Sequence, residues 1–89
     1  MMASYSITIG GADMVVAFVL LKVGRGSEIS ATDKIKKLPG VLDVAALYGE
    51  YDAVVKVEKK NMEELQSFLV KEIRQIDGVA KTSTLIANN

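Results

Sequence analysis

Four strand-like segments alternate with two amphipathic segments along the 89 residues of this chain. The first strand is predicted at residues 14–23, where Lys22 is the one polar residue in an otherwise apolar run. A run of this kind is typical of a strand that is covered on both faces. Three further strands are predicted at residues 41–48, 53–58 and 79–87.

The first of two predicted helices follows the first strand. Ala31, Ile35 and Leu38 recur there at helical spacing. Either Ser27 or Ser30 is placed to cap the helix. The Pro-Gly pair directly after Leu38 ends it, because proline cannot continue a helix.

The second predicted helix begins at Asn61, a good capping residue, with Glu64 three positions later in a pattern close to a capping box. It ends before Gly78, a residue type that commonly terminates helices. Its apolar stripe comprises Met62, Leu65, Leu69, Ile73 and Ile76, with Phe68 at the margin.

The element order strand-helix-strand-strand-helix-strand predicts an α+β, ferredoxin-like βαββαβ fold. The two predicted helix-to-strand connections, at residues 38–41 and 76–79, have similar sequences. This similarity supports a fold made of two related halves. Both helices then cover one face of the sheet, and the other face stays open. Because that face is apolar in the first two strands, it exceeds the apolar patch that a small monomer normally exposes. We therefore expect two subunits to pack sheet on sheet.

The domain itself is expected at residues 14–89. Residues 1–13 lack clear periodicity, and we interpret them as an N-terminal extension or tag. The alternative is a short extra strand at residues 5–9, where polar and apolar residues alternate passably.

Composition excludes several classes of function. Eleven basic and eleven acidic residues cancel, which argues against direct nucleic-acid binding. With no Cys and no His, neither disulfides nor a metal site is expected, and the cytoplasm is the predicted location. The longest apolar stretch, residues 14–21, is too short to cross a membrane.

The same inventory argues against an enzyme, and no cofactor is indicated. Without His or Cys, only carboxylates, Lys, Tyr and hydroxyls remain as acids, bases or nucleophiles. The turn at residues 24–27 offers backbone N–H groups that could hold an anion, but it lacks the rest of a phosphate-loop pattern. We favour a simple turn there.

The most informative segments are residues 48–52 and 81–84. The first, Tyr-Gly-Glu-Tyr-Asp, lies between two strands and predicts a hairpin turn. A turn does not explain Asp52, because a carboxylate that enters an apolar strand needs a partner. In the second segment, Thr82 and Thr84 stand where Val or Ile is more usual, although threonine also forms strands well. Together the two segments offer a carboxylate for an ammonium group and hydroxyls for a carboxylate. These are the two charged groups of a free α-amino acid.

From residue 14 onward the chain resembles the effector-binding domain of the Lrp/AsnC, or feast/famine, regulators, also called the RAM domain. Three segments carry the resemblance in the family's order and spacing: residues 38–41 (Leu-Pro-Gly-Val), 48–52, and 78–84 (Gly-Val-Ala-Lys-Thr-Ser-Thr). The resemblance implies a dimeric α+β barrel that assembles further into tetramers or octamers. It also implies a small effector, typically an amino acid, between dimers.

Carried over by position, the resemblance places Asp52 against the ligand's ammonium group. The other ligand-binding residues that it implies are Gly49 and Tyr51, which shape the pocket, and Thr82, Ser83 and Thr84, which offer hydroxyl and backbone contacts. Full-length regulators of the family also carry an N-terminal helix-turn-helix, for which residues 1–13 are too few. The chain thus resembles the stand-alone members, which sense a metabolite or join full-length regulators in transcriptional regulation.

Two other functions remain open at this stage. One is a small dimeric α+β barrel enzyme of the monooxygenase or isomerase type, which would need an enclosed pocket containing Tyr48 or Tyr51. The other is a purely structural partner that forms hetero-oligomers without binding a ligand.

Overall fold

The computed structural model describes residues 14–87, and both the proposed extension at residues 1–13 and the alternative strand within it lie outside this range. The strands are β1 (Val15–Val23), β2 (Val41–Ala46), β3 (Ala53–Lys59) and β4 (Val79–Ile86). The helices are α1 (Glu28–Lys36) and α2 (Met62–Phe68), and α2 continues into the π-turn η2 (Leu69–Ile73). The predicted element order is confirmed, and β2 ends two residues earlier than expected.

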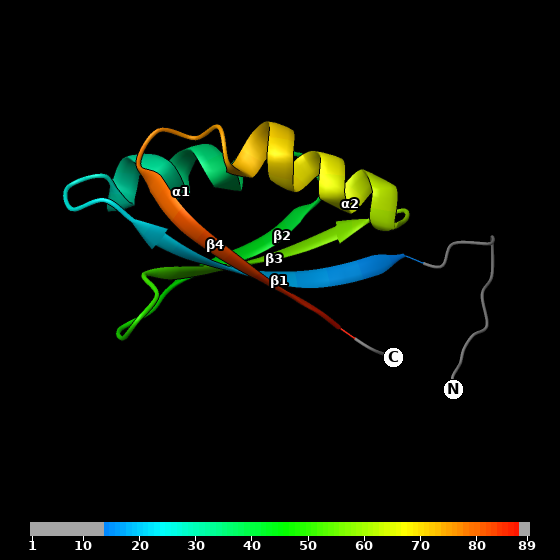
Figure 1. The fold of residues 1–89 in the computed structure, drawn as a ribbon, viewed down its shortest axis with the longest axis horizontal. Coiled ribbons are helices and arrows are strands. Elements are labelled where there is room, and N and C mark those ends of the chain that lie inside the picture. The colour runs from blue at the N-terminus through cyan, green and yellow to red at the C-terminus, as the bar shows by residue number, and fades with distance from the viewer. Residues whose placement is uncertain (1–13, 88–89) are drawn as a thin grey trace.

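The four strands form one antiparallel sheet in the order β2-β3-β1-β4. Both helices lie on the same side of this sheet (Figure 1). The predicted ferredoxin-like α+β fold is therefore confirmed. β1 is an inner strand and is hydrogen-bonded on both sides, while β4 and β2 are the edge strands.

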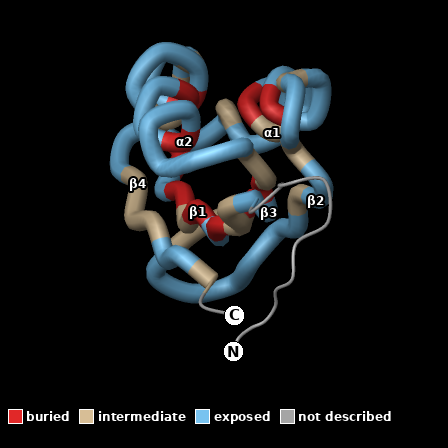
Figure 2. Tube along the Cα trace, turned by 90° about the vertical axis from the view of Figure 1, so that its right-hand side faces the viewer, coloured by how far each residue is buried: buried red, intermediate tan, exposed pale blue. Residues whose placement is uncertain are grey.

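The core lies between the helices and one face of the sheet, as the buried segments in Figure 2 show. Alternate residues of β1 and β3 point into it, together with residues from both helices. Its members are Ala17, Val19, Leu21, Val23, Ala31, Ile35, Ala53, Val55, Val57, Leu65, Phe68 and Ile73.

The second helix departs from the predicted stripe. Met62 is exposed, whereas Phe68, which we expected at the margin, is buried. The N–H of Arg74 donates to the carbonyl of Leu69 at 2.9 Å, five residues earlier, so the last turn is wider than an α-turn. This extra residue separates the buried Phe68 from the buried Ile73 by five positions and shifts the inward face.

The N-terminal cap of α2 agrees with the sequence prediction, whereas that of α1 does not. The Asn61 side chain accepts a hydrogen bond from the N–H of Glu64 at 2.8 Å, which confirms the cap. Ser27 is the residue before α1, but its side chain makes no capping bond. It packs instead against Gly78, where an added Cβ would lie 2.6 Å from the Ser27 Cβ.

The sheet face away from the helices is formed by the other alternating set of residues. Phe18 lies on it opposite Lys56 and Leu85, and Leu20 lies opposite Val54. Phe18 and Leu85 are 36% and 55% exposed. The apolar open face that the sequence predicts is therefore present in the chain.

Candidate ligand-binding site

The β2–β3 connection forms the predicted hairpin. The N–H of Leu47 donates to the carbonyl of Asp52 at 2.9 Å and closes the loop. Within it Gly49 has a φ of 147°, a conformation that L-residues rarely adopt, and Tyr48 is fully exposed. The hairpin therefore places Asp52, the last residue of the 48–52 segment, beside the end of β1.

Asp52 has a protein partner in this position. Its Oδ2 accepts a hydrogen bond from the N–H of Val23 at 2.8 Å, and its own N–H donates to the carbonyl of Leu21 at 2.7 Å. The carboxylate is half-buried and joins the β2–β3 hairpin to the end of β1. This bond supplies the partner that an acid in an apolar strand requires.

Side chains around the hairpin bring basic groups to the open face of the sheet. Lys22 Nζ donates to the carbonyl of Glu50 at 3.0 Å. Lys81 Nζ lies 6.0 Å from the centre of the Tyr51 ring. Because Lys22 and Lys81 are cross-strand partners, both side chains leave the sheet on the same face.

The three hydroxyl residues of β4 divide between the two faces. Thr82 and Thr84 are paired with the buried Leu21 and Val19, so they face the helix side. Ser83 is paired with Leu20 and faces the open side. The sequence segment thus does not form a single cluster of hydroxyls.

Asp52 and Thr82 lie on opposite sides of β1, since Leu21 bonds to the first and is paired with the second. Two strand spacings separate them, on the order of 10 Å. Within one chain the predicted acid and the predicted hydroxyls therefore do not meet.

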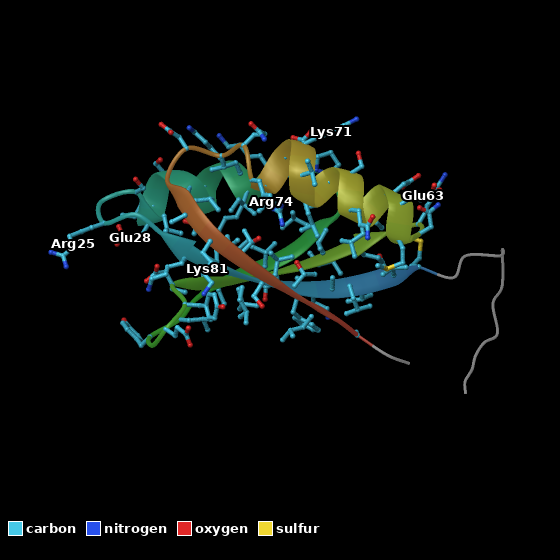
Figure 3. The ribbon with its side chains drawn as sticks, in the orientation of Figure 1. Arg25, Glu28, Glu63, Lys71, Arg74 and Lys81 are labelled. Atoms are coloured by element: carbon cyan, nitrogen blue, oxygen red, sulfur yellow. The ribbon has the colours of Figure 1, made fainter. Side chains whose placement is uncertain are left out.

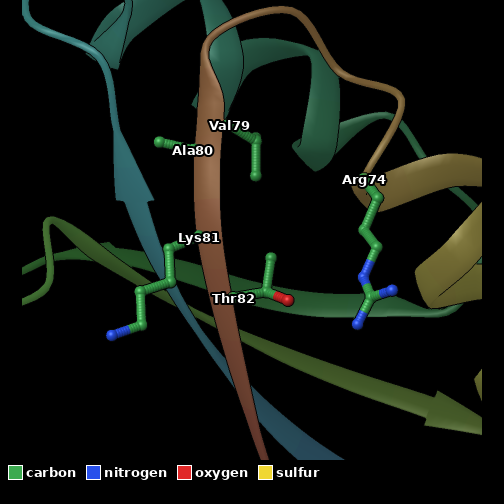
Figure 4. A pocket seen from close by; sticks show the side chains of 5 residues that line it. All are labelled: Arg74, Val79, Ala80, Lys81 and Thr82. Atoms are coloured by element: carbon green, nitrogen blue, oxygen red, sulfur yellow. The ribbon is translucent and has the colours of Figure 1, made fainter.

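A pocket of about 310 Å³ lies along β4, beneath the end of the second helix. Its lining residues are Arg74, Val79, Ala80, Lys81 and Thr82 (Figure 4). The register between β1 and β4 shifts between Lys22 and Val23, which leaves Ala80 as an extra residue of β4. Such a bulge bends a strand and re-aims its side chains.

Arg74 lines this pocket, and the sequence did not single it out. An arginine at the end of a helix is usually explained by the helix dipole, so its position gave no signal. Arg74 directly follows the π-turn, and its side chain extends to the level of Thr82 of β4 (Figure 4).

A second pocket of about 290 Å³ lies at the other end of the helices and includes Pro39, Lys59 and Phe68. The Lys59 ammonium group is already engaged there, because Lys59 Nζ donates to the carbonyl of Pro39 at 2.8 Å and lies 4.3 Å from the centre of the Phe68 ring. Neither Tyr48 nor Tyr51 lines these two pockets, so they give no support to the barrel-enzyme alternative.

The turn at residues 24–27 is occupied by its own chain. The N–H of Gly26 donates to Glu28 Oε1 at 2.9 Å, which places a carboxylate where an anion would bind. Arg25 and Glu28 lie together at this end of the molecule (Figure 3). Within residues 14–87, no group of His, Cys, Asp and Glu side chains is arranged to hold a metal, and no helix there is long and apolar enough to cross a membrane.

Comparisons with known proteins identify the family of this chain. The model of the family described as "Lrp/AsnC ligand binding domain" matches residues 16–89. The HTH-type transcriptional regulator FL11 of Pyrococcus furiosus is 40% identical over 72 residues, which are 81% of this chain and 47% of the regulator. The chain thus spans about half the length of the curated relatives it matches.

Solved structures show the same fold. The hypothetical protein PHS023 from Pyrococcus horikoshii superposes with a TM-score of 0.79 at 36% identity, over 84% of this chain and 90% of that one. A transcriptional regulator from Neisseria meningitidis in complex with L-Met superposes with a TM-score of 0.79, over 96% of this chain and 58% of that one. At 18% identity, the second likeness concerns the fold alone.

Proposed function

The chain belongs to the Lrp/AsnC ligand-binding domain family, and from this premise we propose that it binds an amino acid as an effector and oligomerises in transcriptional regulation. The family and the named regulators among its relatives support a regulatory, effector-binding role rather than an enzymatic one. The amino-acid class is supported by the L-Met complex of the Neisseria meningitidis regulator and by the paired acid and hydroxyl segments of this chain.

The observation that carries the proposal is the separation of these segments within one chain. Asp52 lies at one side of β1 and Thr82 at the other, too far apart for one small ligand to touch both. A second copy that brings its own Asp52 near β4 would complete a site with an acid for the ammonium group and donors for the carboxylate. We therefore place the effector between chains.

The open sheet face supports the first step of that assembly. Phe18, Leu20, Val54 and Leu85 form its apolar centre, and burial of such a face against a second copy removes it from water. We propose a homodimer formed sheet on sheet, which assembles further into a tetramer or octamer. Full-length Lrp/AsnC regulators are the proposed additional partners, and the module itself makes no contact with DNA.

Dimer formation is tested by the variant Phe18→Asp. A carboxylate in the centre of the sheet contact would be buried without a partner, so we expect the dimer to dissociate. Sedimentation equilibrium should give the mass of two or more chains for the unmodified protein and of one chain for the variant. Tyr48→Asp, in the fully exposed turn, is the matched control and should keep the larger mass. Equal masses for the unmodified protein and Phe18→Asp would refute the sheet contact.

Effector binding is tested by a thermal-shift panel of the twenty amino acids. A ligand present at one hundred times its dissociation constant adds about 2.7 kcal/mol to the free energy of unfolding. For a domain of this size, that gives a rise in melting temperature of roughly 10 °C or more. A panel with no response would exclude the amino-acid proposal and leave the structural-partner alternative.

The variant Asp52→Asn separates the two roles of this residue. An Asn side-chain oxygen still accepts the N–H of Val23, so we expect the fold to be retained, while the affinity for the amino-acid ammonium falls by about tenfold or more. Asp52→Ala removes both interactions and should also lower the melting temperature of the free protein. Undiminished affinity in Asp52→Asn would show that the carboxylate only joins the hairpin to β1.

A further inference from the structure

We infer that the effector of this module is an acidic amino acid, whose extra carboxylate is bound by Arg74 in the β4 pocket. This inference rests on the proposed function and names the ligand class of the same site. It depends on three observations: the free guanidinium of Arg74, the donors on the edge of β4, and the charged groups around the completed site.

Arg74 is not used by the fold. Across residues 14–87, its guanidinium makes no hydrogen bond or ion pair with another residue of the chain. The end of the second helix is closed by other groups, because the backbone N–H of Arg74 donates to Leu69 and Gln75 Nε2 donates to the carbonyl of Val70 at 3.2 Å. The guanidinium is thus available for a ligand, and its planar fork suits a carboxylate.

β4 presents further donors to the same pocket. The N–H of Ala87 donates to the carbonyl of Val16 at 2.8 Å, which makes this a hydrogen-bonded pair. Antiparallel pairs alternate, so the pairs Val19–Thr84 and Leu21–Thr82 are non-hydrogen-bonded. The N–H groups of Thr82 and Thr84 therefore point away from β1, toward the free edge of the sheet. The Thr82 hydroxyl lies on the Arg74 side of the strand (Figure 4).

The charged groups of the completed site suit a ligand that carries a second carboxylate. No carboxylate lines the β4 pocket, and the Lys81 ammonium lies on the other side of the same strand. Asp52 of a second copy adds one negative charge, and Lys22 and Glu50 beside it add one of each sign. Arg74 is thus the residue whose charged group points into the pocket. With Asp52 of the second copy for the ammonium group and the N–H donors of β4 for the α-carboxylate, Arg74 is left for a second carboxylate of the ligand.

The volume of the pocket agrees with this class. About 310 Å³ is at the lower end of the range for small-molecule sites. Glutamate and aspartate are short, polar and flexible enough to place one carboxylate at Arg74 while the α-amino group remains near the chain-to-chain contact. A long apolar side chain would instead lie beside the guanidinium without a hydrogen bond to it.

The test compares ligands of equal size that differ in charge. Dissociation constants of L-glutamate and L-glutamine, and of L-aspartate and L-asparagine, are measured by titration calorimetry at low and at physiological salt. A charge-assisted hydrogen bond predicts that the acidic member of each pair binds roughly 10- to 100-fold more tightly. 2-Oxoglutarate, which has both carboxylates and no ammonium, should bind more weakly than glutamate if the second copy's Asp52 takes part.

The variant Arg74→Gln removes the charge and keeps most of the side chain. We expect it to weaken glutamate binding and so to abolish the preference for glutamate over glutamine. Arg74→Lys should restore part of the preference. Arg25→Gln, which removes one cation from the distant β1–α1 turn, changes the net charge equally and should leave the preference intact.

Each outcome decides the inference. Tighter binding of neutral amino acids, or equal binding of each pair, would overturn it and leave the proposed function standing. A preference that survives in Arg74→Gln would overturn the role of Arg74. A lower melting temperature of ligand-free Arg74→Gln, with the glutamate preference unchanged, would show that Arg74 serves the helix end only. No response to any amino acid would overturn both the inference and the proposed function.

Discussion

Replacing Leu21 with alanine is expected to lower the free energy of unfolding by about 2–5 kcal/mol, because the change leaves a cavity in the centre of the core. Leu21 is fully buried, and it lies on the central strand between Ala53 of β3 and Thr82 of β4. Its carbonyl also accepts the N–H of Asp52. The cavity therefore lies under β1, the strand that lies between the Asp52 turn and the hydroxyl residues of β4.

Thermal or urea denaturation, at one protein concentration for all variants, measures this effect. For a domain of this size, each kcal/mol corresponds to about 4–8 °C in melting temperature. Leu42→Ala is the matched control, since it removes the same atoms from a side chain that is 54% exposed, and should change the free energy of unfolding far less. Equal losses in the two variants would contradict the position of Leu21 in the core.

Replacing Gly40 with alanine is expected to destabilise the fold by about 3 kcal/mol or more. Gly40 has a φ of 88°, which costs an alanine roughly 1–2 kcal/mol. An added Cβ would also lie 2.7 Å from the carbonyl oxygen of Glu58, a backbone atom that cannot move aside. The N–H of Glu58 donates to the carbonyl of Gly40 at 2.8 Å, so the clash would break the contact between the α1–β2 corner and β3.

Gly26→Ala isolates the two contributions to this loss. Its φ of 89° is nearly the same, but nothing lies within 4 Å of an added Cβ. It should therefore show the conformational cost alone, and the difference between the two variants should give the cost of the clash. Denaturation curves of the two proteins measure both quantities. Loss of equal size in the two variants would argue against the close approach of Gly40 and Glu58.

Much of the fold follows from the sequence because each element carries a local signal. The continuous apolar run at residues 14–23 predicts the first strand, and the Asn61–Glu64 pair predicts the start of α2. The second helix shows where local signals fail. Regular 3.6-residue spacing places Phe68 at the margin, but the structure buries it, and the π-turn that follows keeps Ile73 buried five positions later. Nothing in the local pattern distinguishes a π-turn from one more α-helical turn.

The candidate site was predicted in its parts and not in its arrangement. The sequence singled out Asp52 and the Thr82–Thr84 segment by their chemistry, since polar groups in apolar strands require partners. The structure shows that Asp52 has one such partner in Val23, and that alternation sends Ser83 to the face opposite Thr82 and Thr84. Their role in ligand binding stays a prediction.

For this protein, the sequence by itself determined the fold, the family and the apolar sheet face, because these depend on periodicity and on short segments of fixed order. Only the tertiary structure decided which groups meet. Strand order places β1 between the 48–52 turn and β4, and Arg74, which directly follows the π-turn, lines a pocket along the bulged strand β4. Turn width and strand register are set by packing across the whole sheet, so a local pattern could not predict the Arg74 pocket.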